Sequence, residues 1–135
     1  MLGSLAYLYV GSAAFEADVR FYRDILKGRL AWAFERFGAR VAAFELSSGP
    51  LVLLADHRPA GEVRLLYRVE NLESAESELR ARGLEIEAKI EVPPGPCLLF
   101  RDPSGNRLGV IQEERPGAMA ASYADPSNGH RIPLG

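Results

Sequence analysis

The stretch "FRDPSGNRLGVIQ", residues 100–112, combines a tight turn with the strand that follows it. Residues 102–106 have the composition of a β-turn, and residues 107–112 include Leu108, Val110 and Ile111, aliphatic residues that favour a strand. Gly109 stands in the middle of this strand, where glycine is normally unfavourable because it has no side chain to pack. It indicates either open space that a ligand can fill, or a β-bulge or close backbone contact.

The order of elements that ends with this strand occurs twice in the chain. A strand from Leu5 to Val10 precedes the amphipathic helix "AAFEADVRFYRDIL", and three extended runs follow. The strand "VRLLYRV" and the helix "LESAESELRARG" begin the second copy, again with three extended runs. The repeat predicts one α+β domain over residues 1–113, built from two βαβββ units at about 4–58 and 62–113 that share a core.

Composition limits the classes of function. A chain of 135 residues with 47% hydrophobic residues and a net charge of −2 has no basic block, so nucleic acid is not an expected partner. No apolar run reaches the roughly 20 residues that a membrane helix needs. Cys97 is the only cysteine, and the N-terminus lacks the pattern of a signal peptide, so a cytoplasmic protein without disulfides is expected.

The last segment, residues 114–135, differs from the rest of the chain. It is rich in proline, glycine, serine and alanine and shows no periodicity. The composition predicts an extended C-terminal tail, either disordered or lying along a partner subunit.

The two βαβββ units, the helix ending "FYRDIL" and the closing "FRDPSGNRLGVIQ" together resemble the vicinal oxygen chelate superfamily, which includes glyoxalase, bleomycin-resistance proteins and extradiol dioxygenases. The resemblance covers about residues 4–112. It implies a cup-shaped, curved mixed sheet in which each unit forms half of a ligand site. It also implies a homodimer, because members of the family usually cover their exposed sheet edges by pairing chains.

Many members of this superfamily hold a divalent metal through a His or Gln on the first strand of each unit and a Glu on the last. When the strands are aligned with those of the family, these four positions correspond to Leu5, Val52, Arg64 and Gly109. None of these residue types is an ordinary metal ligand. The sequence therefore predicts no metal and no cofactor.

Strand alternation suggests which side chains line the cup. Tyr7 and Tyr9 share a face with Leu5, and Arg64 and Arg68 share the corresponding face of the equivalent strand. With Trp32 and Gly109 they form the predicted ligand-binding set, which suits an aromatic or anionic small molecule. The alternatives are that the arginines lie on the surface and that the aromatic residues belong to the core.

The function predicted from these residues is binding of a small organic molecule in a metal-free cup. An alternative is a metal-independent or atypical isomerase, lyase or dioxygenase-like enzyme acting on a small oxygenated substrate, with His57 as a candidate general base. Asp56 precedes His57 on a strand end and points to the other side, so the two do not form a pair. A third hypothesis is a partner-binding module that acts through the tail.

Overall fold

A single curled sheet of eight strands runs through the computed structural model, which describes residues 1–134. The elements follow in the order β1 (Leu5–Gly11), α1 (Phe15–Arg20), η1 (Phe21–Ile25, π-helical), β2 (Arg29–Arg36), β3 (Ala39–Glu45), β4 (Leu51–Ala55), β5 (Val63–Arg68), α2 (Leu72–Ala81), β6 (Ala88–Val92), β7 (Gly95–Arg101), β8 (Arg107–Ile111) and α3 (Ala118–Ala124). No helix among these residues is long and apolar enough to cross a membrane.

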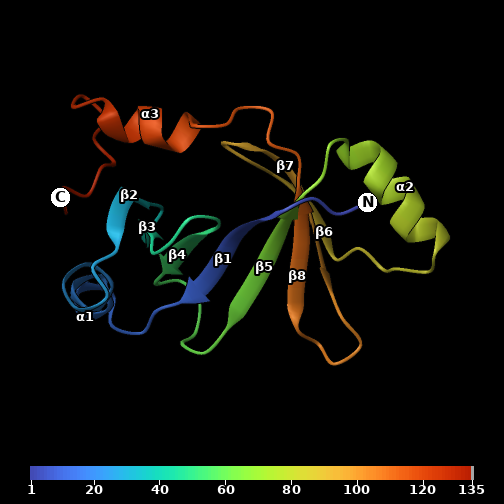
Figure 1. The fold of residues 1–135 in the computed structure, drawn as a ribbon, viewed down its shortest axis with the longest axis horizontal. Helices are drawn as coiled ribbons and strands as arrows, with labels where there is room; N and C mark the ends of the chain where they lie inside the picture. Colours follow the sequence, from blue (N-terminus) through green and yellow to red (C-terminus); the bar gives the residue numbers. More distant parts are fainter. Residues whose placement is uncertain (135) are drawn as a thin grey trace.

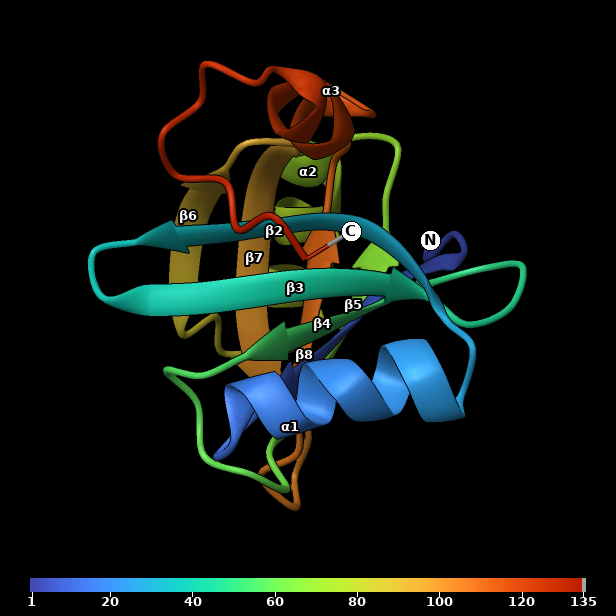
Figure 2. The same ribbon diagram turned by 90° about the vertical axis from the view of Figure 1, so that its left-hand side faces the viewer.

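The strands lie in the order β2-β3-β4-β1-β5-β8-β7-β6, so each half of the sheet comes from one repeat unit. Antiparallel pairing of β1 with β5 joins the halves, while β1 with β4 and β5 with β8 are parallel pairs. Figure 2 shows β2, β3 and β4 crossing in front of β7 and β8, because the sheet curls between its halves. The predicted α+β fold with a curved mixed sheet is confirmed.

Two helices, α1 and α2, cover the outer sides of the sheet, and neither lies on its inner side (Figure 1). On the first half, Phe15 and Val19 of α1 pack against Phe44 and Leu54, and the whole cluster is buried. On the second half, α2 packs through Leu72 and Ala75 against a cluster of buried residues that includes Leu98 and Val110. Since side chains alternate along a strand, the residues between these core positions face the inner side.

The first helix departs from its predicted apolar stripe at its end. The spacing of Phe15, Val19, Tyr22 and Leu26 predicts four buried residues, but Leu26 is 45% exposed. Its N–H donates to the carbonyl of Phe21, five residues earlier, at 3.0 Å. This wider π-helical turn adds a residue to the turn and rotates Leu26 away from the core.

The C-terminal segment forms a helix and packs against its own chain, unlike the predicted extended tail. After α3, the N–H of Ile132 donates to the carbonyl of Ala33 at 2.9 Å, which extends pairing beyond the edge strand β2. The Tyr123 hydroxyl donates to the Ile132 carbonyl at 2.6 Å, and its ring meets that of Phe34 edge-on at 5.6 Å. These contacts order a segment that has little intrinsic structure.

Gly109 lies in a regular part of the sheet, where it pairs with Leu66 on β5 and Leu99 on β7. No bulge is present at this position. A Cβ at Gly109 would lie 2.6 Å from Leu66 Cδ2 and 2.8 Å from the Leu98 carbonyl oxygen. The structure therefore corrects the prediction of open space: glycine is needed because its neighbours fill that space.

We expect Gly109→Ala to lower the free energy of unfolding by about 1–3 kcal/mol, because the added methyl group displaces Leu66 and the backbone of β7. Gly129→Ala is the matched control, since a Cβ there meets nothing within 4 Å and the φ angle is not positive. Urea unfolding followed by circular dichroism measures both. A Gly109→Ala protein as stable as the control would contradict the crowding at this position.

Candidate functional site

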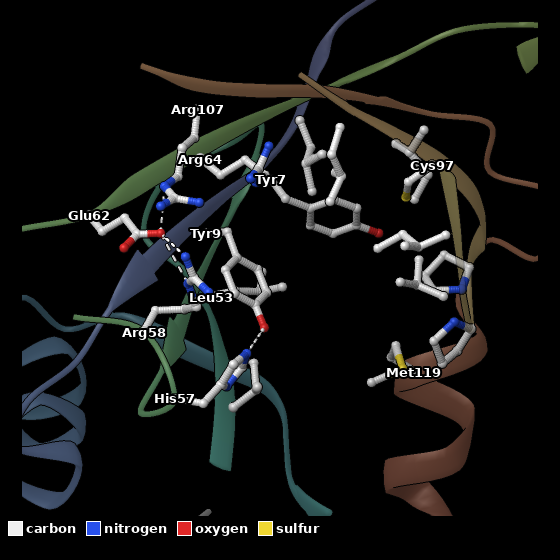
Figure 3. Close-up of a pocket in the computed structure, with 18 of the residues that line it drawn as sticks. Tyr7, Tyr9, Leu53, His57, Arg58, Glu62, Arg64, Cys97, Arg107 and Met119 are labelled. Carbon is white, nitrogen blue, oxygen red and sulfur yellow. Dashed lines mark hydrogen bonds and ion pairs between the residues drawn. The ribbon is translucent and has the colours of Figure 1, made fainter. Parts of the chain in front are cut away.

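The inner side of the sheet encloses a cavity of about 380 Å³, lined by residues from both halves and from α3. This volume lies in the range of small-molecule sites. Its walls are mainly apolar and aromatic, and Tyr7, Trp32, Leu53, Leu66, Leu99 and Met119 are among them. Figure 3 shows a second group gathered on one side of the cavity, where Arg58, Glu62, Arg64 and Arg107 lie close together.

We call the side of the cavity with Arg58, Arg64 and Arg107 its cationic end, and one carboxylate, that of Glu62, lies among these three arginines. Glu62 Oε1 lies 3.0 Å from Arg58 Nε and 2.6 Å from Arg107 Nε. Hydrogen bonding from Arg58 holds the pKa of Glu62 below its ordinary value, so this carboxylate stays ionised at neutral pH. Three guanidinium groups against one carboxylate leave two positive charges in excess at this end of the cavity.

Arg64 differs from the two arginines that contact Glu62. Its Nη1 donates to the carbonyl of Leu108 at 2.6 Å and approaches that of Phe100 at 3.5 Å. Within residues 1–134 it forms no ion pair with a carboxylate. Burial, followed by the charge of Arg107, lowers its pKa from the ordinary value, although a guanidinium remains protonated near neutrality. Arg64 is thus the cavity arginine best placed to receive an anionic ligand.

A glycine in β1 fixes the loop that carries His57, Arg58 and Glu62. Gly11 packs so closely on this loop that a Cβ would overlap the carbonyl of Pro59. The N–H of Gly11 also donates to the carbonyl of Glu62 at 2.9 Å. The small residue therefore lets the loop between β4 and β5 close over the end of β1 and brings its charges to the cavity.

Two tyrosines on the cavity wall have different partners. The hydroxyl of Tyr9 lies 3.2 Å from His57 Nε2 (Figure 3). The hydroxyl of Tyr7 donates to Glu113 Oε2 at 3.3 Å. Burial and then the charge of Glu113 raise the pKa of Tyr7 to about 12, so this hydroxyl is a hydrogen-bond donor and not a base at neutral pH.

The structure brings most of the predicted ligand-binding residues to one cavity. Lining residues include Tyr7, Tyr9, Trp32, His57 and Arg64. Two other predicted residues lie elsewhere. Arg68 is ion-paired with Glu113 and bonds Ser4 Oγ at 2.9 Å, and Gly109 lies beneath Leu66.

Sequence reasoning did not identify Arg58, Glu62, Arg107 or Met119, which also line the cavity. Arg107 could have been found, because it lies two residues before Gly109 on the same strand and so shares its face. The other three lie outside strands, where alternation gives no signal.

The residues of this cavity do not fit the metal that the superfamily often holds. In the β1–β5 pair, Leu5 lies opposite Tyr67 and Arg64 lies opposite Tyr9, so Leu5 and Arg64 do not face each other. Val52 lies beside the cavity residue Leu53 and therefore faces the other side of the sheet. In the described part of the chain, no three His, Cys, Asp or Glu side chains are grouped as a metal would need.

Comparison with known proteins places the chain in a family. The model of the Glyoxalase/Bleomycin resistance protein/Dioxygenase superfamily matches residues 5–110, and the chain belongs to this superfamily. No curated protein sequence gives a significant match.

Similar solved structures include methylmalonyl-CoA epimerase from Mycobacterium tuberculosis, with a TM-score of 0.72, 15% identity, and coverage of 84% of this chain and 90% of that one. A variant of the Streptomyces coelicolor methylmalonyl-CoA epimerase in complex with 2-nitronate-propionyl-CoA has a TM-score of 0.71 and 14% identity, and the match covers 85% of this chain and 100% of that one. A hypothetical protein from Bacillus halodurans C-125 has a TM-score of 0.69 and 13% identity, with coverage of 82% of this chain and 94% of that one. At these identities the likeness shows the fold alone.

The thiol of Cys97, which is buried on the cavity wall, provides a test of how closed the site is. Burial raises its pKa to about 12. At pH 8 we expect alkylation by iodoacetamide at least about 100-fold slower in the folded protein than in urea, because the unfolded thiol has a pKa near 8.5. Mass spectrometry follows the reaction. Rates within tenfold of each other would show that the thiol is accessible and that the wall is open.

Proposed function

We propose that this member of the superfamily binds a small organic molecule with an apolar or aromatic body and one anionic group, and that it does so without a metal. The observation that carries the proposal is Arg64, a half-buried guanidinium without a carboxylate partner, at the charged end of a cavity whose other walls are mainly apolar. An anion there would gain charge-assisted hydrogen bonds that are stronger than those between neutral groups.

The rest of the cavity supports the apolar part of the ligand. Trp32 and Tyr7 present ring surfaces, and Leu53, Leu66 and Leu99 add aliphatic ones. Aromatic rings favour offset or edge-on contact with another ring, and burial of apolar surface contributes roughly 25 cal/mol per Å². The contrast between these walls and the cationic end orients a ligand that has one charged end.

A second candidate function is an enzyme that moves a proton on a small oxygenated substrate. The specific observation is the pair formed by His57 Nε2 and the Tyr9 hydroxyl on the cavity wall. Such a pair can relay a proton to or from a bound molecule. An enzyme would exchange a carbon-bound hydrogen of a co-purified ligand with D₂O, and His57→Gln would abolish this exchange, whereas a binding protein would leave the ligand unchanged.

We also propose that the protein acts in the cytoplasm as a homodimer. The outer face near the end of the first helix exposes Phe21, Ile25 and Leu26, at 47%, 68% and 45% of their surfaces. An apolar patch of this kind is typical of an interaction surface. A second copy of the chain would remove it from water.

Light scattering at micromolar concentration is expected to give twice the mass of one chain. Ile25→Glu places a charge in the exposed apolar patch, and we expect it to shift the mass to that of a monomer without loss of thermal stability. A wild-type protein that is monomeric under these conditions would contradict the homodimer.

Calorimetric titration with naphthalene-1-sulfonate tests the anion site. We expect the wild type to bind this probe and Arg64→Met to bind it at least about tenfold more weakly, because the charge-assisted hydrogen bonds are lost. The neutral analogue naphthalene-1-sulfonamide should bind both proteins alike.

Arg82→Met is the matched control, since Arg82 is an exposed arginine paired with Glu78 outside the cavity. We expect this variant to bind the sulfonate as the wild type does. Equal sulfonate affinity in wild type and Arg64→Met, or no binding to either, would refute the proposed function.

A further inference from the structure

Glu62 is the only carboxylate among the described residues that line the cavity, and it is largely shielded from water. Its side chain is 18% exposed, against 36% for Arg58 and 25% for Arg107. A single oxygen, Oε1, contacts both arginines. Because the hydrogen bond between Gly11 and Glu62 also fixes the backbone here, the carboxylate is held in place as an internal counter-ion.

This carboxylate affects ligands of different charge unequally. The three arginines create a positive potential at the cationic end, and Glu62 reduces it. Coulomb attraction to the excess positive charge grows in proportion to the charge of the ligand, whereas the cost of removing the ligand from water grows with the square of that charge. By lowering the positive potential, Glu62 therefore disfavours a dianion more than a monoanion in the same place. In addition, Arg58 and Arg107 already donate to Glu62, and a second negative charge would have to compete with it for them.

We propose that Glu62 determines the charge class of the ligand, making the cavity selective for a monoanion bound at Arg64 and unfavourable for a dianion such as a phosphate monoester. The proposal rests on the proposed function, because it assumes that the cavity binds an anionic small molecule. A repulsive group that excludes the wrong ligand is a common source of specificity. Without it, three guanidinium groups would offer the forked donors that suit phosphate.

The test compares two probes with the same ring, naphthalene-1-sulfonate and 1-naphthyl phosphate, by calorimetry at pH 8. The first carries one negative charge, and the second carries nearly two because its second pKa is near 6. We expect the wild type to bind the sulfonate at least about tenfold more tightly than the phosphate. Glu62→Gln keeps the size of the side chain, and we expect it to shift the affinity ratio at least about tenfold towards the phosphate.

Glu78→Gln is the matched control, because it removes one negative charge from an exposed residue that pairs with Arg82 outside the cavity. We expect this variant to leave the affinity ratio within about twofold of the wild type. An equal shift in both variants would mean that overall charge, and not Glu62, sets the preference, and would overturn the proposal.

The remaining outcomes separate the two proposals. No binding of the sulfonate to the wild type refutes the proposed function itself. Sulfonate binding with an unchanged ratio in Glu62→Gln refutes only the role of Glu62.

A test without any variant covers the case in which Glu62→Gln does not fold. The phosphate is mostly a monoanion at pH 5 and mostly a dianion at pH 8. Relative to the affinity for the sulfonate at the same pH, the wild type should bind 1-naphthyl phosphate at least about tenfold more tightly at pH 5 than at pH 8. Equal relative affinities would also overturn the proposal.

Discussion

The antiparallel pairing of β1 with β5 is the interaction on which the site depends. Each repeat unit has one sheet face covered by its own helix, so its other face needs a second surface opposite it. The β1–β5 pairing supplies that surface by joining the halves at the centre of the curled sheet, with Tyr7 opposite Leu66 and Tyr9 opposite Arg64. These four residues from two units then line one cavity.

The charged end of this cavity depends on a second constraint, the close contact between Gly11 and the loop that joins the units. Arg64 and Arg107 come from neighbouring strands, whereas Arg58 and Glu62 come from this loop. Partly buried charges are costly unless they are paired. The arginines meet this requirement unequally, because Arg58 and Arg107 share Glu62 while Arg64 has only carbonyl partners. That inequality is the basis for proposing Arg64 as the position that binds an anion.

Sequence periodicity predicted the fold and part of the site, because alternation along a strand fixes which side chains share a face. Tyr7, Tyr9 and Arg64 follow that rule. Arg68 shares their alternation, but at the end of β5 it turns to Glu113. Whether the space at Gly109 is open or filled depends on the conformation of the Leu66 side chain, which no pattern in a single sequence encodes. Met119 reaches the cavity only because tertiary contacts with β2 order the C-terminal segment.

A crystal structure of the protein with naphthalene-1-sulfonate bound would show both where an amphipathic anion binds and how it is oriented. We expect the sulfonate beside the guanidinium of Arg64 and the naphthalene ring against Tyr7, Trp32 and Leu66. A ring bound outside the cavity, or a sulfonate directed towards Met119 at the opposite side, would contradict this expectation.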